Sequence, residues 1–123
     1  GGIALPLVAF YNAEIVAGAE FILVKLNFEK HLQWADLVIT GEGKIDSQTL
    51  GNKAPFAVAK AARKKNKPVI AIGGKVETGA LKVFDGIFSF ANGPLTLEKS
   101  IKDSEKLLYN FSGQLARLLI SVV

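Results

Sequence analysis

Residues 35–53 read A-D-L-V-I-T-G-E-G-K-I-D-S-Q-T-L-G-N-K, and within them a short apolar block gives way to glycine and charge. Residues 37–39 are continuously apolar rather than alternating, which favours a strand covered on both faces, as in a parallel sheet between helices. We predict that this strand ends at Thr40 and that residues 41–44 form a loop at its carboxyl end. Open α/β sheets bind their ligands at that end of the strands. The stretch therefore predicts an α/β fold with a ligand site after the strand.

A second apolar run, residues 69–72, has the same design, since Gly73 and Gly74 follow it directly. The segment between the two runs predicts a helix that opens at Pro55, a residue suited to the first helical position. Its apolar face is expected to consist of small residues with one phenylalanine: Phe56, Val58, Ala61 and Ala62. A strand, a helix and a second strand form a βαβ unit with parallel strands. Both glycine-containing segments should then open on the same rim of the sheet.

The remaining sequence predicts a third strand and helices for both faces of the sheet. The third strand is placed at residues 87–90. Residues 1–10 are predicted to be a glycine-led loop running into a helix, and further helices are placed at residues 14–26, 28–34, 80–83 and 97–101 and in a final segment capped by Asp103 or Ser104. Asn27 is expected to cap the helix at residues 28–34, which should bury Phe28, Leu32 and Trp34. The final helix carries an apolar stripe: Leu107, Leu108, Phe111, Leu115, Leu118, Leu119 and Val122. Together these elements predict a three-layer α/β sandwich with a mostly parallel sheet flanked by helices.

Length and composition narrow the possible classes of protein. The 123 residues suit a single α/β domain covering residues 1–123, and half of them are hydrophobic. The absence of cysteine excludes disulfides, thiolate metal sites and cysteine nucleophiles. Residues 3–11 form the longest apolar stretch, far short of the roughly 20 residues that span a bilayer, and no basic segment precedes it. We therefore expect a cytoplasmic protein without a membrane partner.

The net charge of +4 raises the question of a polyanionic partner. The densest basic cluster, residues 63–67, falls at the end of a predicted helix, where cations complement the helix dipole. Aromatic residues are not interleaved with it, as single-stranded nucleic acids would require. His31 is the only histidine and is expected to be exposed, so no histidine pair can bind a metal. We predict neither a nucleic-acid partner nor a metal site built by protein side chains alone.

The charges of the central stretch indicate its chemistry. A Walker A loop is absent, and the segment that begins at Gly41 lacks the last glycine of the dinucleotide fingerprint, because Asp46 stands in its place. Acidic side chains here would repel a pyrophosphate held by backbone groups alone, but they suit a metal ion or a substrate hydroxyl. The residues thus predict a polar, glycine-lined rim for a small anionic ligand. The alternative is that each charge forms an ordinary surface ion pair.

The string D-L-V-I-T-G-E-G-K-I-D-S-Q-T-L, followed by K-A-P and then by K-P-V-I-A-I-G-G, resembles the bacterial glycerate kinases that phosphorylate the 2-hydroxyl of glycerate. The match runs through residues 36–74, with weaker similarity on both sides. Family members are much longer, so the resemblance implies that this chain is the later part of a two-domain kinase and is inactive alone. One departure is Asn52, which precedes Lys53 where the family has glycine.

The resemblance implies ATP and Mg²⁺ as cofactors, D-glycerate as the substrate, and a homodimer as one possible assembly. Asp46 is the expected base or hydroxyl-orienting group, and Glu42 is expected to position glycerate or a magnesium-bound water. The expected substrate- and phosphate-binding residues are Gly41, Gly43, Lys44, Lys53, Gly73 and Gly74. Two alternatives stay open: a non-catalytic α/β module that binds a small organic acid or nucleotide, and a scaffold whose catalytic groups lie elsewhere.

Overall fold

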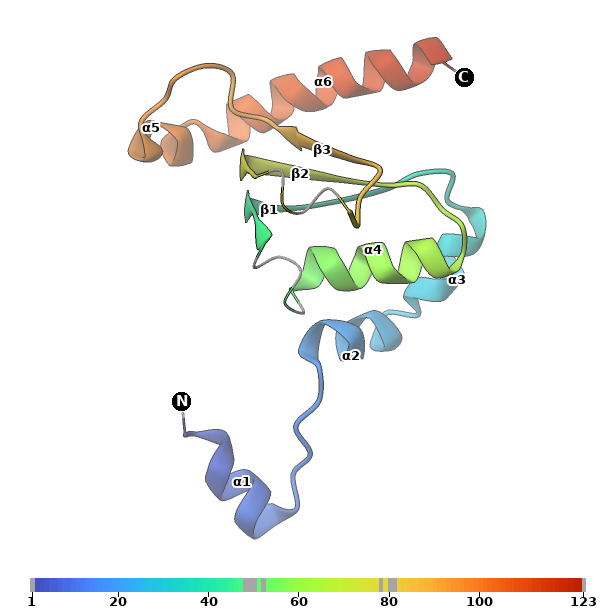
Figure 1. The fold of residues 1–123 in the computed structure, drawn as a ribbon, viewed down its shortest axis with the longest axis vertical. Helices are drawn as coiled ribbons and strands as arrows, with labels where there is room; N and C mark the ends of the chain where they lie inside the picture. Colours follow the sequence, from blue (N-terminus) through green and yellow to red (C-terminus); the bar gives the residue numbers. More distant parts are fainter. Residues whose placement is uncertain (1, 48–50, 52, 78, 80–81, 123) are drawn as a thin grey trace.

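The structure of the chain is a computed structural model that describes residues 2–47, 51, 53–77, 79 and 82–122 (Figure 1). Its elements, in chain order, are α1 (Ala4–Tyr11), α2 (Gly18–Lys25), α3 (Phe28–Trp34), β1 (Val38–Ile45), α4 (Ala54–Lys64), β2 (Val69–Val76), β3 (Gly86–Ser89), α5 (Leu97–Lys102) and α6 (Ser104–Val122). The helix predicted at residues 80–83 includes positions outside the described residues. The three predicted strands are all present.

The described strands form one sheet in the order β1-β2-β3, and both neighbouring pairs are parallel. Val38 pairs with Val69 and Ile70 pairs with Gly86, so all three strands point the same way. Their carboxyl ends therefore lie along one edge of the sheet. The predicted α/β class with a parallel sheet is confirmed.

Strands β1 and β2 are longer than predicted, because their glycines continue the strands instead of ending them. The register is maintained from Val38↔Val69 through Lys44↔Lys75 to Ile45↔Val76. A Cβ atom added to Gly41 would lie 2.5 Å from the Ile72 carbonyl oxygen. The predicted loop at residues 41–44 is thus wrong: glycine at position 41 allows two strands to approach each other closely.

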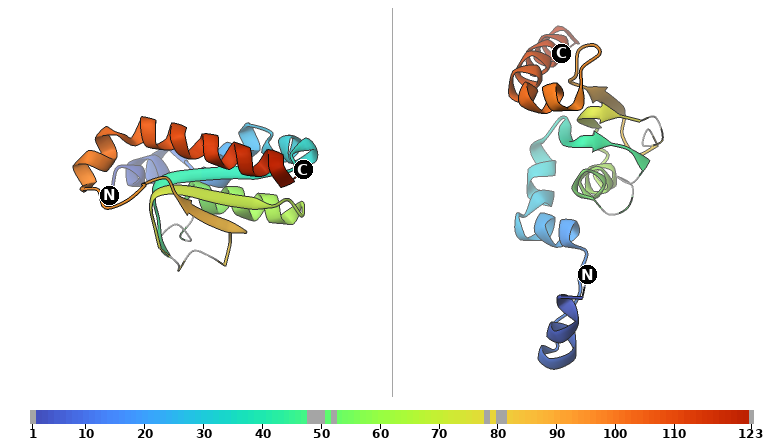
Figure 2. Two further views of the ribbon diagram at one scale, coloured as in Figure 1. Left: turned by 90° about the horizontal axis from the view of Figure 1, so that it is seen from above. Right: turned by 90° about the vertical axis from the view of Figure 1, so that its left-hand side faces the viewer.

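Helices cover both faces of the sheet, which confirms the predicted three layers (Figure 2). Helix α4 packs on one face, where Ala59 and Ala62 are fully buried in a core with Val38 and Val69. Small alanines bring the helix close to the strands, as expected. Its buried residues are Pro55, Ala57, Ala59 and Ala62. Of the predicted face, Ala62 is buried, while Phe56, Val58 and Ala61 are half-buried. Helix α6 lies over the other face, where the Phe111 and Phe88 ring centroids are 6.1 Å apart.

The apolar stripe of α6 is only partly covered. Leu107 is buried, and Phe111, Leu115 and Leu119 are half-buried. Leu108, Leu118 and Val122 are exposed. The first turns of α6 thus pack on the domain, while much of the stripe near its carboxyl end is open to solvent.

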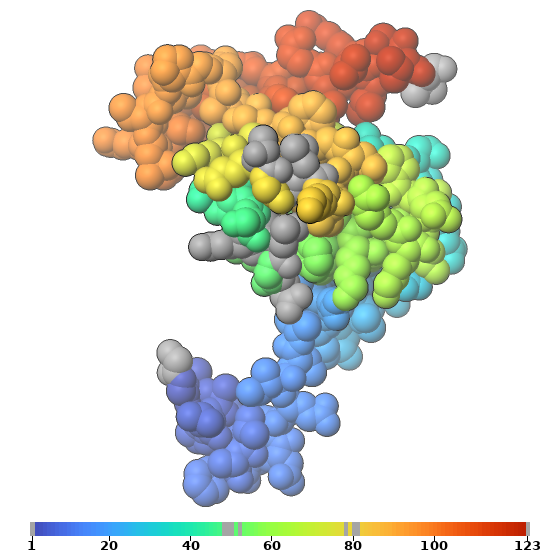
Figure 3. Space-filling view, in the orientation of Figure 1, coloured from blue at the N-terminus to red at the C-terminus, as the bar shows by residue number. Residues whose placement is uncertain are grey.

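The N-terminal region departs most from the prediction. Residues 12–17 form no helix, so the helix expected at residues 14–26 begins only at Gly18. The side chains of Ile15 and Val16 are exposed, and a short helix without tertiary contacts is marginal in water. Helix α1 forms a lobe of its own, joined to the domain by this thin segment (Figure 3).

Helix α3 matches its predicted bounds, with one difference at each end. Asn27 has a left-handed backbone (φ 51°) and its side chain makes no capping hydrogen bond. Leu32 is buried and Phe28 is half-buried, as predicted, but Trp34 is exposed. His31 is exposed, as predicted. Within the described residues, no helix is long and apolar enough to cross a membrane.

Candidate active site

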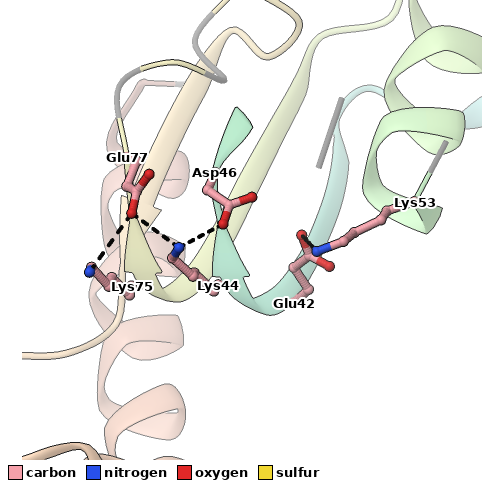
Figure 4. Close-up of polar contacts among 6 residues, drawn as sticks. All are labelled: Glu42, Lys44, Asp46, Lys53, Lys75 and Glu77. Carbon is pink, nitrogen blue, oxygen red and sulfur yellow. Dashed lines mark ion pairs between the residues drawn. The ribbon is translucent and has the colours of Figure 1, made fainter. Parts of the chain in front are cut away.

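The candidate site lies at the carboxyl ends of β1 and β2, where charged side chains from both strands gather (Figure 4). Lys44 of β1 and Lys75 of β2 are direct partners in the parallel register. One residue further along, Ile45 is fully buried in the core, which fixes the end of β1. The core therefore determines where the charged residues on either side of Ile45 stand.

Asp46 is the buried charged residue of this edge. It follows Ile45 directly and is only 5% exposed. The Lys44 ammonium nitrogen lies 2.7 Å from Asp46 Oδ2, while half of the Lys44 side chain is exposed. Lys44 thus connects a shielded carboxylate to the solvent-facing rim, and charge-assisted hydrogen bonds of this length are the strong ones.

Glu77 extends this ion pair onto the second strand. Its backbone N–H donates to the Ile45 carbonyl oxygen at 2.8 Å, which holds Glu77 beside the end of β1. Its Oε1 lies 3.2 Å from Lys44 Nζ and 3.8 Å from Lys75 Nζ. We call the four side chains of Lys44, Asp46, Lys75 and Glu77 the rim network. Hydrogen bonds from Lys44 to Asp46 and then to Glu77 raise the pKa of Lys44 above its ordinary value.

Lys75 and Glu77 had no role in the sequence-based prediction. The signal that places them is the pairing register: with Val38 set against Val69, Lys44 falls opposite Lys75. That alignment requires both strands to continue through their glycines. The prediction that the glycines form loops puts Lys75 and Glu77 on the same rim, but it does not pair Lys75 with Lys44.

Glu42 and Lys53 form a second group of charges. Lys53 immediately precedes α4, and its Nζ lies 3.8 Å from Glu42 Oε1. Figure 4 shows this pair apart from the rim network. The structure therefore places the two predicted catalytic carboxylates, Asp46 and Glu42, at the same edge of the sheet but in different groups.

The predicted ligand-binding glycines all lie within β1 and β2. A Cβ atom on Gly73 would meet Ile45 Cγ1 at 2.9 Å, and one on Gly74 would meet the Gly43 carbonyl oxygen at 3.0 Å. The contact at Gly41 is shorter still, whereas a Cβ atom on Gly43 would meet nothing within 4 Å. Three of these glycines thus have a packing reason to be glycine, and their ligand-binding role stays a prediction. Asn52 lies outside the described residues.

No three His, Asp or Glu side chains in the described part of the chain gather as a metal site. One hollow in the same part lies elsewhere, between α2, α3 and α4, with a volume of about 480 Å³. It is lined by apolar side chains such as Leu23 and Phe28 and by ion-paired residues such as Lys60 and Glu20. The charges at the strand ends are thus on an open edge rather than in this hollow.

The fold and this edge define a class: a parallel α/β domain with paired lysines and carboxylates where such sheets bind ligands. The particular family follows from comparison with known proteins. The sequence model of the glycerate kinase family matches residues 1–120, and the chain belongs to this family.

Individual glycerate kinases are similar to the chain in sequence and in structure. The chain is 42% identical over 110 residues to a glycerate kinase of Bacillus cereus, covering 86% of this chain and 29% of the relative. It is 37% identical over 123 residues to the glycerate 2-kinase of Escherichia coli K12, covering 97% and 32%. A crystal structure of a protein designated glycerate kinase 2, from Salmonella typhimurium LT2, superposes with a TM-score of 0.71 at 37% identity and covers 98% of this chain and 30% of that one. The chain thus spans about three tenths of the length of these relatives.

Proposed function

We propose that the protein containing this chain is a glycerate kinase that transfers the γ-phosphoryl group of ATP to the 2-hydroxyl of D-glycerate. We further propose that the chain is one part of a longer, two-domain cytoplasmic enzyme and is inactive alone. Family membership supports the reaction. The observation that carries the assignment of the site is the shielded Asp46 carboxylate, fixed by Lys44 at the carboxyl edge of a parallel sheet.

Asp46 is the proposed base. The glycerate hydroxyl oxygen forms a bond to the γ-phosphorus, the bond from that phosphorus to the bridging oxygen breaks, and ADP leaves with the electron pair. The hydroxyl proton passes to the Asp46 carboxylate. Lys44 holds this carboxylate in one orientation, and the low exposure of Asp46 limits competition from water. Positioning of this kind supplies most of the catalysis in phosphoryl transfer.

Lys53 is the proposed partner of the phosphoryl group on the other side of the site. Nearly half of its side chain is exposed, so it is accessible to an anionic ligand. Glu42 lies beside it at 3.8 Å and limits where the ammonium group can go. In this proposal Glu42 orients Lys53 and the bound glycerate, while Asp46 takes part in the proton transfer.

The donor set at this edge suits a magnesium–nucleotide complex. Mg²⁺ is usually held by one or two carboxylates together with substrate phosphates rather than by an all-protein cage. Glu42 is the carboxylate that would serve in this way, since Asp46 is the proposed base. When bound, Mg²⁺ supplies neutralisation of the phosphate charge.

The first experiment is a coupled assay of ADP release with Mg²⁺, ATP and D-glycerate, run on the full-length protein and on the 123-residue chain. We expect glycerate-dependent turnover from the full-length protein and none from the chain alone. Phosphorus NMR of the product tests the acceptor, because the 2- and 3-phosphates of glycerate have different spectra. Binding of glycerate or ATP by the full-length protein without turnover would contradict the kinase assignment and support a non-catalytic module.

A further inference from the structure

The two lysines of the rim network share a single acceptor oxygen. Lys44 and Lys75 are register partners on adjacent parallel strands, so their side chains leave the sheet side by side. Glu77 Oε1 lies within 4 Å of both ammonium groups, at 3.2 Å from Lys44 Nζ and 3.8 Å from Lys75 Nζ. Two like charges on neighbouring positions repel each other, and an anion near both offsets that repulsion. Glu77 supplies that anionic oxygen.

We propose that Lys44 and Lys75 form a binding site for an oxyanion, and that Glu77 is a stand-in which the oxyanion displaces. The ligand is a phosphoryl group or a small carboxylate, both of which present oxygens like those of Glu77. This proposal rests on the proposed function only for the source of the oxyanion, namely the nucleotide or the glycerate.

The exposure of the groups permits this exchange. The side chain of Lys75 is 71% exposed and that of Glu77 is 44% exposed, so a ligand can approach from solvent. The Glu77 backbone is held by its hydrogen bond to Ile45. Displacement therefore requires only rotation of the Glu77 side chain, and an ion pair this exposed contributes little energy that would oppose it.

The same geometry connects the oxyanion to the proposed base. Lys44 Nζ contacts Asp46 Oδ2 at 2.7 Å and Glu77 Oε1 at 3.2 Å. A ligand oxygen that replaces Glu77 Oε1 is thus bound by the ammonium group that also holds Asp46. Binding of the oxyanion and placement of the base are then coupled through one side chain.

The test is calorimetric titration of inorganic phosphate into the full-length protein at constant ionic strength. Glu77→Gln removes the competing charge and should tighten phosphate binding by about twofold to fivefold, the range that an exposed ion pair provides. Lys75→Ala should weaken binding by at least a similar factor. Glu29→Gln and Lys65→Ala are matched controls, because these two residues form an exposed ion pair of 3.4 Å remote from the rim. Both controls should bind phosphate like the wild type.

Parallel titrations with acetate, D-glycerate and magnesium-free ATP identify the source of the oxyanion. A tighter affinity in Glu77→Gln for phosphate and ATP alone assigns the site to phosphoryl groups, and one for acetate and glycerate alone assigns it to the substrate carboxylate. The proposal is overturned if Glu77→Gln binds no oxyanion more tightly than Glu29→Gln does, with thermal unfolding confirming that both variants are folded. Tighter phosphate binding without glycerate turnover would instead overturn the kinase assignment and leave this site standing.

Discussion

Strand β1 (Val38–Ile45) contributes to two groups of charges that differ in how firmly they are built. In the rim network, Lys44 contacts the buried Asp46 at 2.7 Å and also reaches Glu77 of the adjacent chain segment. In the second group, Glu42 and Lys53 approach to 3.8 Å, and the Lys53 side chain is 43% exposed. Charged residues that are close in sequence can therefore differ in function, because their side chains differ in burial. A shielded carboxylate held by a close ion pair suits proton transfer, and an exposed ammonium group 3.8 Å from a half-buried carboxylate suits ligand binding.

The largest expected effect separates the two carboxylates. Asp46→Asn in the full-length enzyme should lower kcat by about 10²-fold to 10⁴-fold, because the amide cannot accept the hydroxyl proton. Glu42→Gln should act mainly on the KM for glycerate, with a much smaller change in kcat. Steady-state kinetics of both variants test this difference. Equal losses in kcat would break the distinction between the two groups.

The next effect concerns the lysines that orient these carboxylates. Lys44→Met should lower kcat by up to about 100-fold, since Asp46 would lose the donor that fixes its orientation. Lys53→Met should raise the KM for ATP and leave kcat nearly unchanged, because its exposed ammonium group is a proposed phosphate ligand, whereas Lys44→Met should lower kcat and also weaken binding at the proposed oxyanion site. The KM-against-kcat pattern is the readout, and Lys65→Met is the control at an exposed ion pair elsewhere. A loss in kcat for Lys53→Met as large as that for Lys44→Met would contradict the assignment.

A stability prediction tests the close packing of β1 against β2, the two strands that carry the rim network. Gly73→Ala should destabilise the domain by about 1–3 kcal/mol, because the new methyl group would stand 2.9 Å from Ile45 Cγ1 and 3.1 Å from the Lys75 carbonyl oxygen. Gly43→Ala has open space around its Cβ position and should change the free energy of unfolding far less. Urea unfolding of the two variants measures the difference. Similar free energies for both would show that β1 and β2 are less tightly packed than described.

The smallest expected effect is a dependence of stability on pH. The folded-state pKa of Lys44 is raised above its ordinary value of 10.5, so its ion pairs contribute to stability fully below that value and are lost as the pH rises through the higher folded-state pKa. Melting temperatures of the wild type and Lys44→Met should therefore differ most near neutral pH and converge above pH 10.5. A gap that widens with rising pH would contradict this sign.

Much of the fold follows from local patterns in the sequence. Residues 37–39 and 69–72 are continuous apolar runs, and the helix between them opens at Pro55, so the parallel unit was predicted with nearly correct starting points. The ends of both strands were wrong. Glycine favours loops locally, but Gly41 and Gly73 are set by contacts with Ile72 and Ile45 on the neighbouring strand. Contacts between strands of this kind leave no trace in a single segment.

Only part of the candidate site was predicted, because its remaining residues also depend on contacts between strands. Asp46, Lys44, Glu42 and Lys53 stand close together in sequence and were found by their charge, but the sequence does not show which pairs form, namely Lys44 with Asp46 and Lys53 with Glu42. Glu77 and Lys75 lie some thirty residues away and enter only through the register of β1 and β2. The helix predicted at residues 14–26 was too long at its start, because the apolar spacing there is helical. Residues 12–17 form no helix, since their apolar side chains have little to pack against.

The most direct test of the central claim is the single-turnover rate of phosphoryl transfer, measured by rapid quench with the full-length enzyme in excess over labelled ATP at saturating D-glycerate. This rate isolates the chemical step from product release. We predict that Asp46→Asn slows it by at least about 100-fold, while the dissociation constant for glycerate changes little. A single-turnover rate in Asp46→Asn equal to that of the wild type would show that the Lys44–Asp46 pair is structural and that the proton is accepted elsewhere.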